Sequence, residues 1–224
     1  MVWKLILQAL AFAVVSGAML VLCAGTTQWV GAWIFLGAMQ GGSLVMSLWL
    51  AARDPELLKD RLSSRRQKKG TADRLLMPLL HVSFFLWLAA MAFDVRLHGT
   101  NQMPTWLNAL GGAAILAAFL TTIRVFRENT YATAIVKVQP ERRQTVVDTG
   151  PYALVRHPLY AVALFTYLAI PFALGSWIGL LGLPLLVLIV AVRASLEEQV
   201  LATALPRYCD YMARVPYRFV PFVW

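Results

Sequence analysis

The sequence GPYALVRHPLY, residues 150–160, stands where a polar segment becomes an apolar one. It gathers a guanidinium, an imidazole and two phenols within nine residues: Arg156, His157, Tyr152 and Tyr160. Arginine and histidine can bind carboxylates or phosphates, and the phenols offer aromatic faces and hydroxyl groups. Pro158 stands where the first turn of a helix would begin, a position that tolerates a missing N–H. The stretch therefore predicts a polar cluster at the mouth of a membrane helix, although the same residue types also collect at ordinary membrane boundaries.

Two apolar spans follow this stretch, at 159–174 and 177–192, and only two residues separate them. So short a turn forces the two spans into a helical hairpin. The polar residues that come after the second span therefore return to within side-chain reach of Arg156 and His157. These residues are Arg193, Glu197 and Glu198.

The composition extends the membrane interpretation to the whole chain. Apolar residues make up 59% of the 224 residues and charged residues 14%. Soluble proteins average about 45–50% apolar and about 25% charged residues. We therefore expect an all-α integral membrane protein. Four further apolar stretches are each long enough for one crossing, which makes about six transmembrane helices in total. The four lie at 5–24, 29–52, 75–95 and 106–125.

The second span carries two features that concern packing. Trp29 and Trp33 stand at its start, where tryptophans are expected as anchors at the membrane interface. Gly37, Gly41 and Gly42 are small residues at helical spacing, and they would let another helix approach closely.

The basic residues lie almost entirely on one side of the expected spans. Of the 20 lysines and arginines, only Arg96 lies on the opposite side; the others are Lys4, eight in 53–74, six in 124–156 and four in 193–218. Cytosolic loops carry an excess of lysine and arginine. We therefore expect both termini and the polar cluster to face the cytosol, with the bacterial inner membrane as the location.

The polar segment 53–74 contains a helix start. Asp54 is a suitable N-cap, and Pro55 fits the first helical position. Together they predict a short helix through Arg61 at the membrane surface. The basic residues of the segment either bind lipid headgroups or serve only as a topology signal.

The cytosolic mouth combines both signs of charge with aromatic rings. A sulfonium favours π faces, an amino group or ribose hydroxyl favours a carboxylate, and a carboxylate favours arginine or histidine. Such a set suits a zwitterionic cofactor that carries an extra positive charge, but it could equally hold the phosphates of a dinucleotide. No histidine or cysteine lies at metal-ligand spacing from His81, so we expect no metal site. We also expect no nucleic-acid partner.

Two ordered motifs, GxYxxxRHPxY and EExxLxxxxxxYxxYxxxVP, flank the hairpin. This arrangement resembles the integral-membrane methyltransferases of the isoprenylcysteine carboxyl methyltransferase and phospholipid N-methyltransferase group. The resemblance covers about the last third of the chain. The matching residues are Gly150, Tyr152, Arg156, His157, Pro158, Tyr160, Glu197, Glu198, Leu201, Tyr208, Tyr211, Val215 and Pro216.

The resemblance implies that S-adenosylmethionine binds at the cytosolic side and that a small or lipophilic methyl acceptor enters from the bilayer. It implies catalytic roles for Arg193, Glu198 and Arg156. It implies cofactor binding by Tyr152, Arg156, His157, Pro158, Tyr160, Glu197, Glu198, Tyr208 and Tyr211. On this basis 1–128 would supply four transmembrane helices and the basic loop, and 129–224 would be the catalytic region. Two β-prone pieces at 136–139 and 145–147 would allow a small hairpin at its start.

Two positions depart from the pattern of these families. A small residue commonly stands two positions after the motif tyrosine, and here Val162 could narrow the pocket. A Phe-Gly pair of the C-terminal segment is replaced by Leu205 and Pro206, which should reshape the terminal helix.

Two alternatives stay open at this point. The sterol reductase group shares the C-terminal layout but uses NADPH; its members usually carry an asparagine where this chain has Leu159. A non-enzymatic membrane scaffold or transporter is the second alternative, and only Pro171 and Pro184 could interrupt the spans as transporters require. The acceptor atom (oxygen, nitrogen or sulfur) and the oligomeric state stay open as well.

Overall fold

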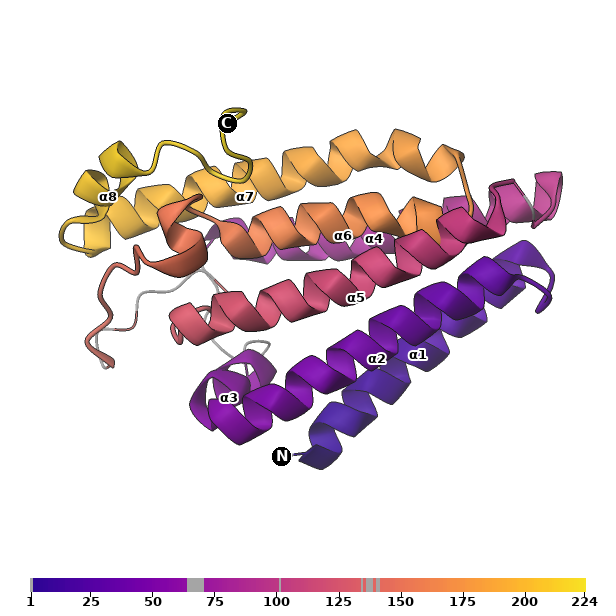
Figure 1. Ribbon diagram of the computed structural model, residues 1–224, viewed down its shortest axis with the longest axis horizontal. Coiled ribbons are helices and arrows are strands. Elements are labelled where there is room, and N and C mark those ends of the chain that lie inside the picture. The colour runs from indigo at the N-terminus through magenta and orange to yellow at the C-terminus, as the bar shows by residue number, and fades with distance from the viewer. Residues whose placement is uncertain (1, 64–70, 101, 134, 136–138, 140–141) are drawn as a thin grey trace.

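The computed structural model describes residues 2–63, 71–100, 102–133, 135, 139 and 142–224, and within them it contains helices and no strand. The long helices run side by side along one axis, with α3 and α8 at the same end of the bundle (Figure 1). The α-helices are α1 Val2–Ala24, α2 Val30–Arg53, α3 Pro55–Ser63, α4 Thr71–His98, α5 Thr105–Glu128, α6 Pro158–Leu174, α7 Leu183–Ala204 and α8 Tyr208–Arg214. Two 3-10 turns, η3 Gly150–Ala153 and η4 Ile178–Gly182, precede α6 and α7.

Five helical stretches among the described residues are long and apolar enough to cross a membrane. They are α1, α2, α4, α5 and the continuous run Ile178–Ala204. The sixth expected span forms α6, an apolar helix of 17 residues. It is shorter than the roughly 20 residues of a usual crossing, and it packs against α5, α2 and α7. The prediction of an all-α membrane protein is confirmed, and five of the six predicted spans meet the length of a crossing.

Local sequence signals fix several helix ends. The Leu57 N–H donates to Asp54 Oδ1 at 2.9 Å, so Asp54 caps α3 as predicted. Gly175 ends α6 in the left-handed conformation, with φ 73°, which glycine adopts without strain. The predicted β-hairpin does not form at 145–147, which has no regular structure, and 136–138 lies outside the described residues.

Glycines let α6 lie close to its neighbours. A Cβ atom on Gly111 of α5 would lie 2.2 Å from the Ala173 backbone nitrogen, and one on Gly31 of α2 would lie 2.6 Å from the Leu174 carbonyl oxygen. The predicted packing role is confirmed for Gly42, where a Cβ would meet the Phe119 ring at 2.1 Å. It is wrong for Gly37 and Gly41, where an added Cβ would have no neighbouring atom within 4 Å.

Substituting Gly111 with alanine should therefore destabilise the protein. The new methyl group meets backbone atoms that cannot rotate away, and overpacking of this kind costs about 1–3 kcal/mol. Gly37→Ala is the matched control, because its methyl group enters open space and alanine favours the helix by roughly 0.5–1 kcal/mol. Thermal unfolding in detergent should rank the two variants on opposite sides of the wild type. Equal stability of the two variants would contradict the close approach of α5 and α6.

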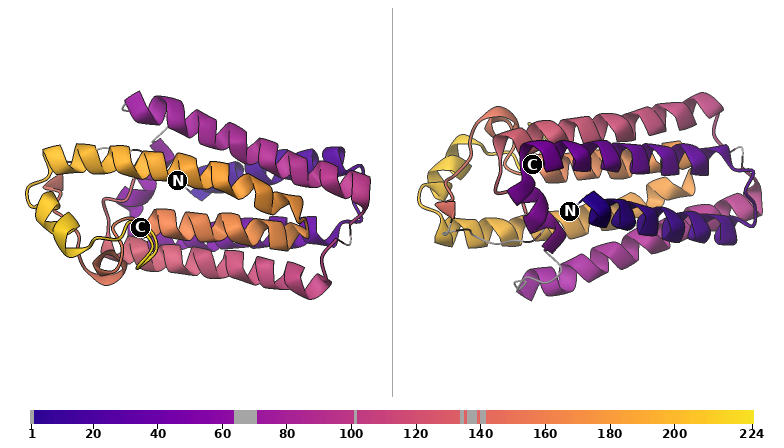
Figure 2. Two further views of the ribbon diagram at one scale, coloured as in Figure 1. Left: turned by 90° about the horizontal axis from the view of Figure 1, so that it is seen from above. Right: turned by 90° about the horizontal axis from the view of Figure 1, so that it is seen from below.

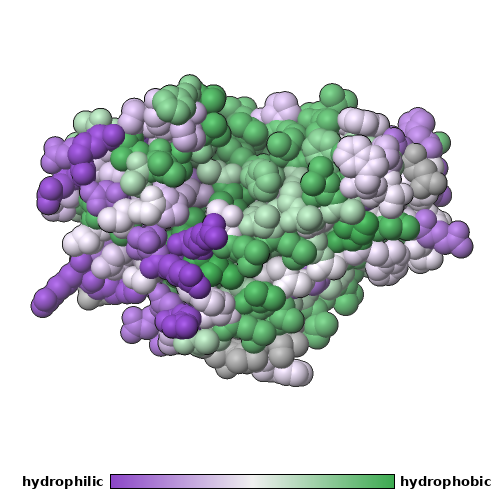
Figure 3. All heavy atoms as spheres, viewed as in Figure 1, coloured by the Kyte–Doolittle hydropathy of each residue, from purple (hydrophilic) through white to green (hydrophobic). Residues whose placement is uncertain are grey.

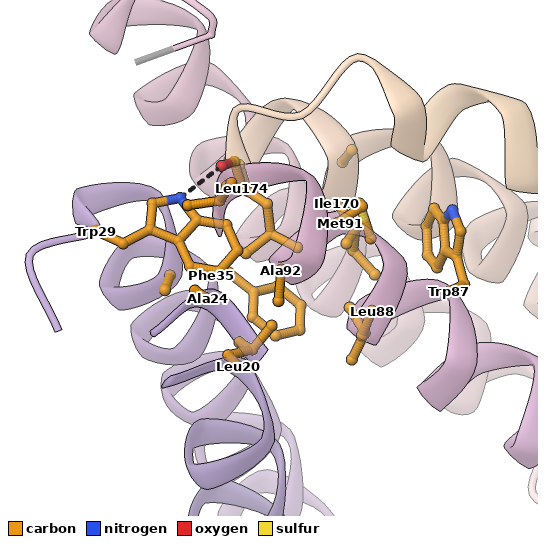
Figure 4. Packing of buried hydrophobic residues seen from close by; sticks show 14 of the residues in the cluster. Leu20, Ala24, Trp29, Phe35, Trp87, Leu88, Met91, Ala92, Ile170 and Leu174 are labelled. Atoms are coloured by element: carbon orange, nitrogen blue, oxygen red, sulfur yellow. Dashed lines mark hydrogen bonds between the residues drawn. The ribbon is translucent and has the colours of Figure 1, made fainter. Parts of the chain in front are cut away.

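Two buried tryptophans join the helices at the end of the bundle away from α3 and α8. Trp29 Nε1 donates to the Leu174 carbonyl at 2.9 Å, and Trp87 Nε1 donates to the Gly179 carbonyl at 2.7 Å. Figure 4 shows Trp29 packed beside Phe35 and Leu174. Trp29 is only 1% exposed, so the prediction that it anchors at the interface is wrong. Its indole finds a buried carbonyl instead, whereas Trp33 is 56% exposed.

The surface is divided along the bundle. Hydrophilic residues gather at the end that carries α3 and α8, and apolar residues dominate the middle of the face seen in Figure 3. Figure 2 shows that the starts of α4 and α6 and the ends of α2, α5 and α7 lie toward this end. We call it the polar end, and it holds the predicted site.

Candidate active site at the polar end

The motif residues 150–160 form the turn that leads into α6. Gly150 has φ 56°, in the left-handed region, and a Cβ there would lie 2.7 Å from the Glu128 side chain. His157 takes the N-cap position of α6 with φ −125° and ψ 65°, and Pro158 opens the helix as predicted. The sequence thus places Arg156 and His157 directly at the entrance of α6.

The C-terminal tail fixes these two residues through their backbone. The Arg156 N–H donates to the Tyr217 carbonyl at 2.9 Å, and the His157 N–H donates to the Arg218 carbonyl at 3.0 Å. Figure 1 shows the tail turning back from α8 along α7. Residues more than fifty positions apart in the chain therefore share one short stretch of paired backbone.

Glu198 is the centre of a buried cluster of charges. Its carboxylate accepts from Arg156 Nε at 2.6 Å and from Arg218 Nε at 2.9 Å, and it lies 3.1 Å from His157 Nε2. The side chains of Arg156 and Glu198 are each only 7% exposed. Arg156 Nη1 also donates to the Val215 and Pro216 carbonyls, both at 2.8 Å. The predicted return of the hairpin to Arg156 and His157 is confirmed.

A second polar chain passes through Arg193. Arg193 Nη1 donates to the Tyr160 hydroxyl at 2.5 Å, and this hydroxyl donates to Glu197 Oε2 at 2.5 Å. Arg193 Nε donates to Asp73 Oδ1 at 3.0 Å, and the Asp73 side chain is 1% exposed. The guanidinium also lies 5.3 Å from the centre of the Tyr160 ring. Asp73 was not predicted, because nothing in the sequence separates it from the other acids of 53–74.

Aromatic rings close the site on two sides. The His157 and Tyr160 rings stack with centres 5.3 Å apart. Tyr211 donates its hydroxyl to the Tyr152 carbonyl at 2.8 Å, and Asn129 Nδ2 donates to the Tyr152 hydroxyl at 2.9 Å. Burial raises the pKa of the Tyr152 phenol well above its usual value. Its hydroxyl therefore stays protonated at neutral pH.

A cavity of about 440 Å³ lies among these groups. Nine of the ten predicted site residues line it: Tyr152, Arg156, His157, Pro158, Tyr160, Arg193, Glu197, Tyr208 and Tyr211. Glu198 is absent from the lining, because its carboxylate faces Arg156, His157 and Arg218 instead. Residues that were not predicted also line the cavity, among them Arg61 of α3 and Asn129 after α5.

The two departures from the family pattern both lie at this cavity. Val162 lines it from α6. Helix α7 ends at Ala204, Leu205 has extended backbone angles, and Arg207 takes the left-handed conformation before α8 begins. Pro206 cannot continue a helix in register. The break turns the chain so that Tyr208 and Tyr211 of α8 are buried beside the cavity.

A family model matches part of the chain. Residues 106–207 match the family model described as phospholipid methyltransferase. The matched region begins in α5 and ends just after α7, so it includes the motif at 150–160 and both glutamates but not α8. No curated protein matches the chain.

Proposed function

We propose that this chain, of which residues 106–207 match the phospholipid methyltransferase family model, transfers the methyl group of S-adenosylmethionine to a small or lipid-like acceptor. The transfer takes place at the membrane boundary, on the cytosolic side of a bacterial inner membrane. One observation supports this most: the cavity at the polar end brings Arg193, Tyr160 and Glu197 together with the motif residues. A volume of about 440 Å³ suits a ligand of cofactor size.

The side chains around the cavity fit the groups of this cofactor. When bound, S-adenosylmethionine supplies a methyl group on a positively charged sulfur and leaves as S-adenosylhomocysteine. The rings of Tyr160 and His157 offer π faces to a sulfonium. Glu197 would accept from the amino group or a ribose hydroxyl, and Arg193 would bind a carboxylate. The hydroxyl groups of Tyr152 and Tyr208 would serve as further hydrogen-bond donors, and Tyr211, whose hydroxyl donates to the Tyr152 carbonyl, would hold Tyr152 in place.

The geometry suggests different roles for the two glutamates. Glu197 lines the cavity and accepts a hydrogen bond from the Tyr160 hydroxyl, so it would take the proton of an amine acceptor directly or through the phenol. Glu198 binds Arg156, His157 and Arg218, so it would hold these side chains in place. A direct catalytic role for Glu198 stays a prediction. A carboxylate or thiolate acceptor would need no base, and positioning with exclusion of water would then suffice.

Ligand binding to the detergent-purified protein tests the cofactor. We expect calorimetry to detect the binding of S-adenosylmethionine and of S-adenosylhomocysteine and to show no heat of binding for NADPH. NADPH binding without either adenosyl ligand would contradict the methyltransferase proposal and favour a reductase. Binding of both adenosyl ligands would support the cofactor but would not identify the methyl acceptor, because the residues of this cavity do not define it.

A further inference from the structure

A second cavity, of about 690 Å³, adjoins the first. Its walls come mainly from α1, α2 and α4, three helices of which α1 packs against both others. Five residues line both cavities and so form their common wall: Arg61, Leu80, Phe119, Thr166 and Tyr167. A molecule in the second cavity would therefore lie between the apolar helices, with one end beside the proposed cofactor site.

The wall from α2 carries a polar stripe. Gln40, Ser43 and Ser47 all line the second cavity, at a spacing of three and then four residues that puts them on one helix face. All three side chains are half-buried. Within the described part of the chain, none of them has a hydrogen-bond partner. An unpaired amide or hydroxyl is costly inside a bilayer, because lipid chains cannot hydrogen-bond to it.

His81 of α4 adds an acceptor to this cavity. Its Nδ1 lies 2.6 Å from the Met77 carbonyl oxygen, which can only accept a hydrogen bond. In the uncharged form of the ring, Nδ1 therefore carries the proton and Nε2 is an acceptor. The cavity thus offers donors and acceptors to a ligand from both α2 and α4, although its other lining residues are mostly apolar.

Arg61 marks the end of the second cavity that meets the first. It is the only arginine, lysine, aspartate or glutamate among the described residues that line this cavity. Burial and the positive charge of Arg193 lower the pKa of Arg61 to about 10, so it stays charged at neutral pH. Arg61 Nη1 donates to the Ala132 carbonyl at 2.8 Å. A charged guanidinium in this wall would bind an anionic group of a ligand.

We propose that the second cavity holds the methyl acceptor, and that it selects an amphiphile with an anionic end at Arg61 and a hydroxyl or carbonyl group on its apolar body. The choice of occupant rests on the proposed function, but the selectivity rests on the cavity alone. Gln40 lies near the middle of α2, so the polar group belongs in the middle of the acceptor chain and not at its head. A site built to hydrogen-bond a hydroxyl group discriminates against the analogue that lacks it.

Competition binding tests the selectivity without any need for turnover. The probe is 11-(dansylamino)undecanoic acid bound to the protein in lipid nanodiscs, displaced by stearate or by 12-hydroxystearate. We expect 12-hydroxystearate to compete about tenfold more strongly than stearate, because the hydroxyl satisfies groups that are otherwise unpaired. The triple variant Gln40→Leu, Ser43→Ala, Ser47→Ala should lose this preference. Leu44→Ala and Val45→Ala, exposed neighbours on the same helix, should keep it.

A second variant tests the position of the anionic end. Arg61→Gln should weaken the binding of both fatty acids by about tenfold, and this loss should be larger than its loss of affinity for S-adenosylhomocysteine. Arg53→Gln should leave the affinity for the fatty acids and for S-adenosylhomocysteine unchanged. A wild type that does not distinguish the two fatty acids, or a triple variant that still does, would overturn the proposal. An Arg61→Gln variant that loses mainly its affinity for S-adenosylhomocysteine, and not for the fatty acids, would also overturn the proposal. Failure of the wild type to bind S-adenosylhomocysteine would instead contradict the proposed function, since the fatty-acid experiment contains no cofactor.

Discussion

Glu198→Ala should abolish high-affinity binding of S-adenosylhomocysteine and lower the thermal stability of the polar end. The substitution leaves Arg156, His157 and Arg218 without the carboxylate that they share. Removing one partner of a buried ion pair costs roughly 3–5 kcal/mol, because the remaining charge stays buried and uncompensated. If this cost falls on the bound state, affinity drops by a factor on the order of 10²–10³.

The loss should spread to the C-terminal tail. Arg156 binds the Val215 and Pro216 carbonyls through the same guanidinium that Glu198 holds. A released guanidinium no longer fixes the tail, so limited proteolysis should cut after α8 sooner in the variant than in the wild type. Calorimetry and thermal unfolding give the other two readouts.

Two further variants separate charge from shape and position. Glu198→Gln keeps one acceptor oxygen but removes the charge, so it should fall between the wild type and Glu198→Ala. Gln199→Ala, an exposed neighbour on α7, should behave like the wild type. If Glu198→Ala binds S-adenosylhomocysteine as the wild type does, the carboxylate does not organise the site.

The elements that the sequence predicted best are those fixed by local signals. Apolar stretches of crossing length became α1, α2, α4 and α5, and Asp54 caps the short helix that follows α2. Part of the site followed from the same signals. A turn at Gly175 can only produce a hairpin, and a hairpin must bring the end of α7 back to the entrance of α6.

Contacts between elements distant in the chain could not be predicted in this way. Trp29 looks like an interfacial anchor by position, but the carbonyl at the end of α6 binds its indole in the core. The Tyr217 and Arg218 carbonyls meet Arg156 and His157 only because the tail folds back. Backbone carbonyls leave no mark in a sequence, so no motif could have indicated them.

Asp73 is the clearest example of a contact that the sequence could not predict, because its partner Arg193 is 120 residues away. Segment 53–74 contains four acids, and composition or spacing does not distinguish Asp73 from Glu56. Only the packing of α4 against α7 decides which of them is buried. The structure puts Asp73 under Arg193 with 1% exposure, and it leaves the Glu56 side chain 80% exposed.

Asp73→Ala should therefore reduce S-adenosylhomocysteine affinity at least about thirtyfold and lower the unfolding temperature. Arg193 would lose the carboxylate that orients it toward Tyr160, and a buried charge left without its partner costs several kcal/mol. Asp73→Asn, which keeps an acceptor oxygen for Arg193 Nε, should recover part of the stability. Glu56→Ala removes an acid from the same segment and should change neither quantity, since exposed ion pairs contribute about 0–1 kcal/mol.

The comparison of Asp73 with Glu56 decides between two views of the basic segment. If 53–74 is only a topology signal, the two alanine variants should insert, unfold and bind alike, because topology depends mainly on lysine and arginine. If Asp73 supports Arg193, only its variant should lose affinity, and Arg193→Lys should show a similar loss because a lysine cannot reach Asp73 and Tyr160 with one planar group. Parallel behaviour of Asp73→Ala and Glu56→Ala would remove Asp73 from the site. A loss confined to Asp73→Ala and Arg193→Lys would tie the start of α4 to the chemistry at the end of α7.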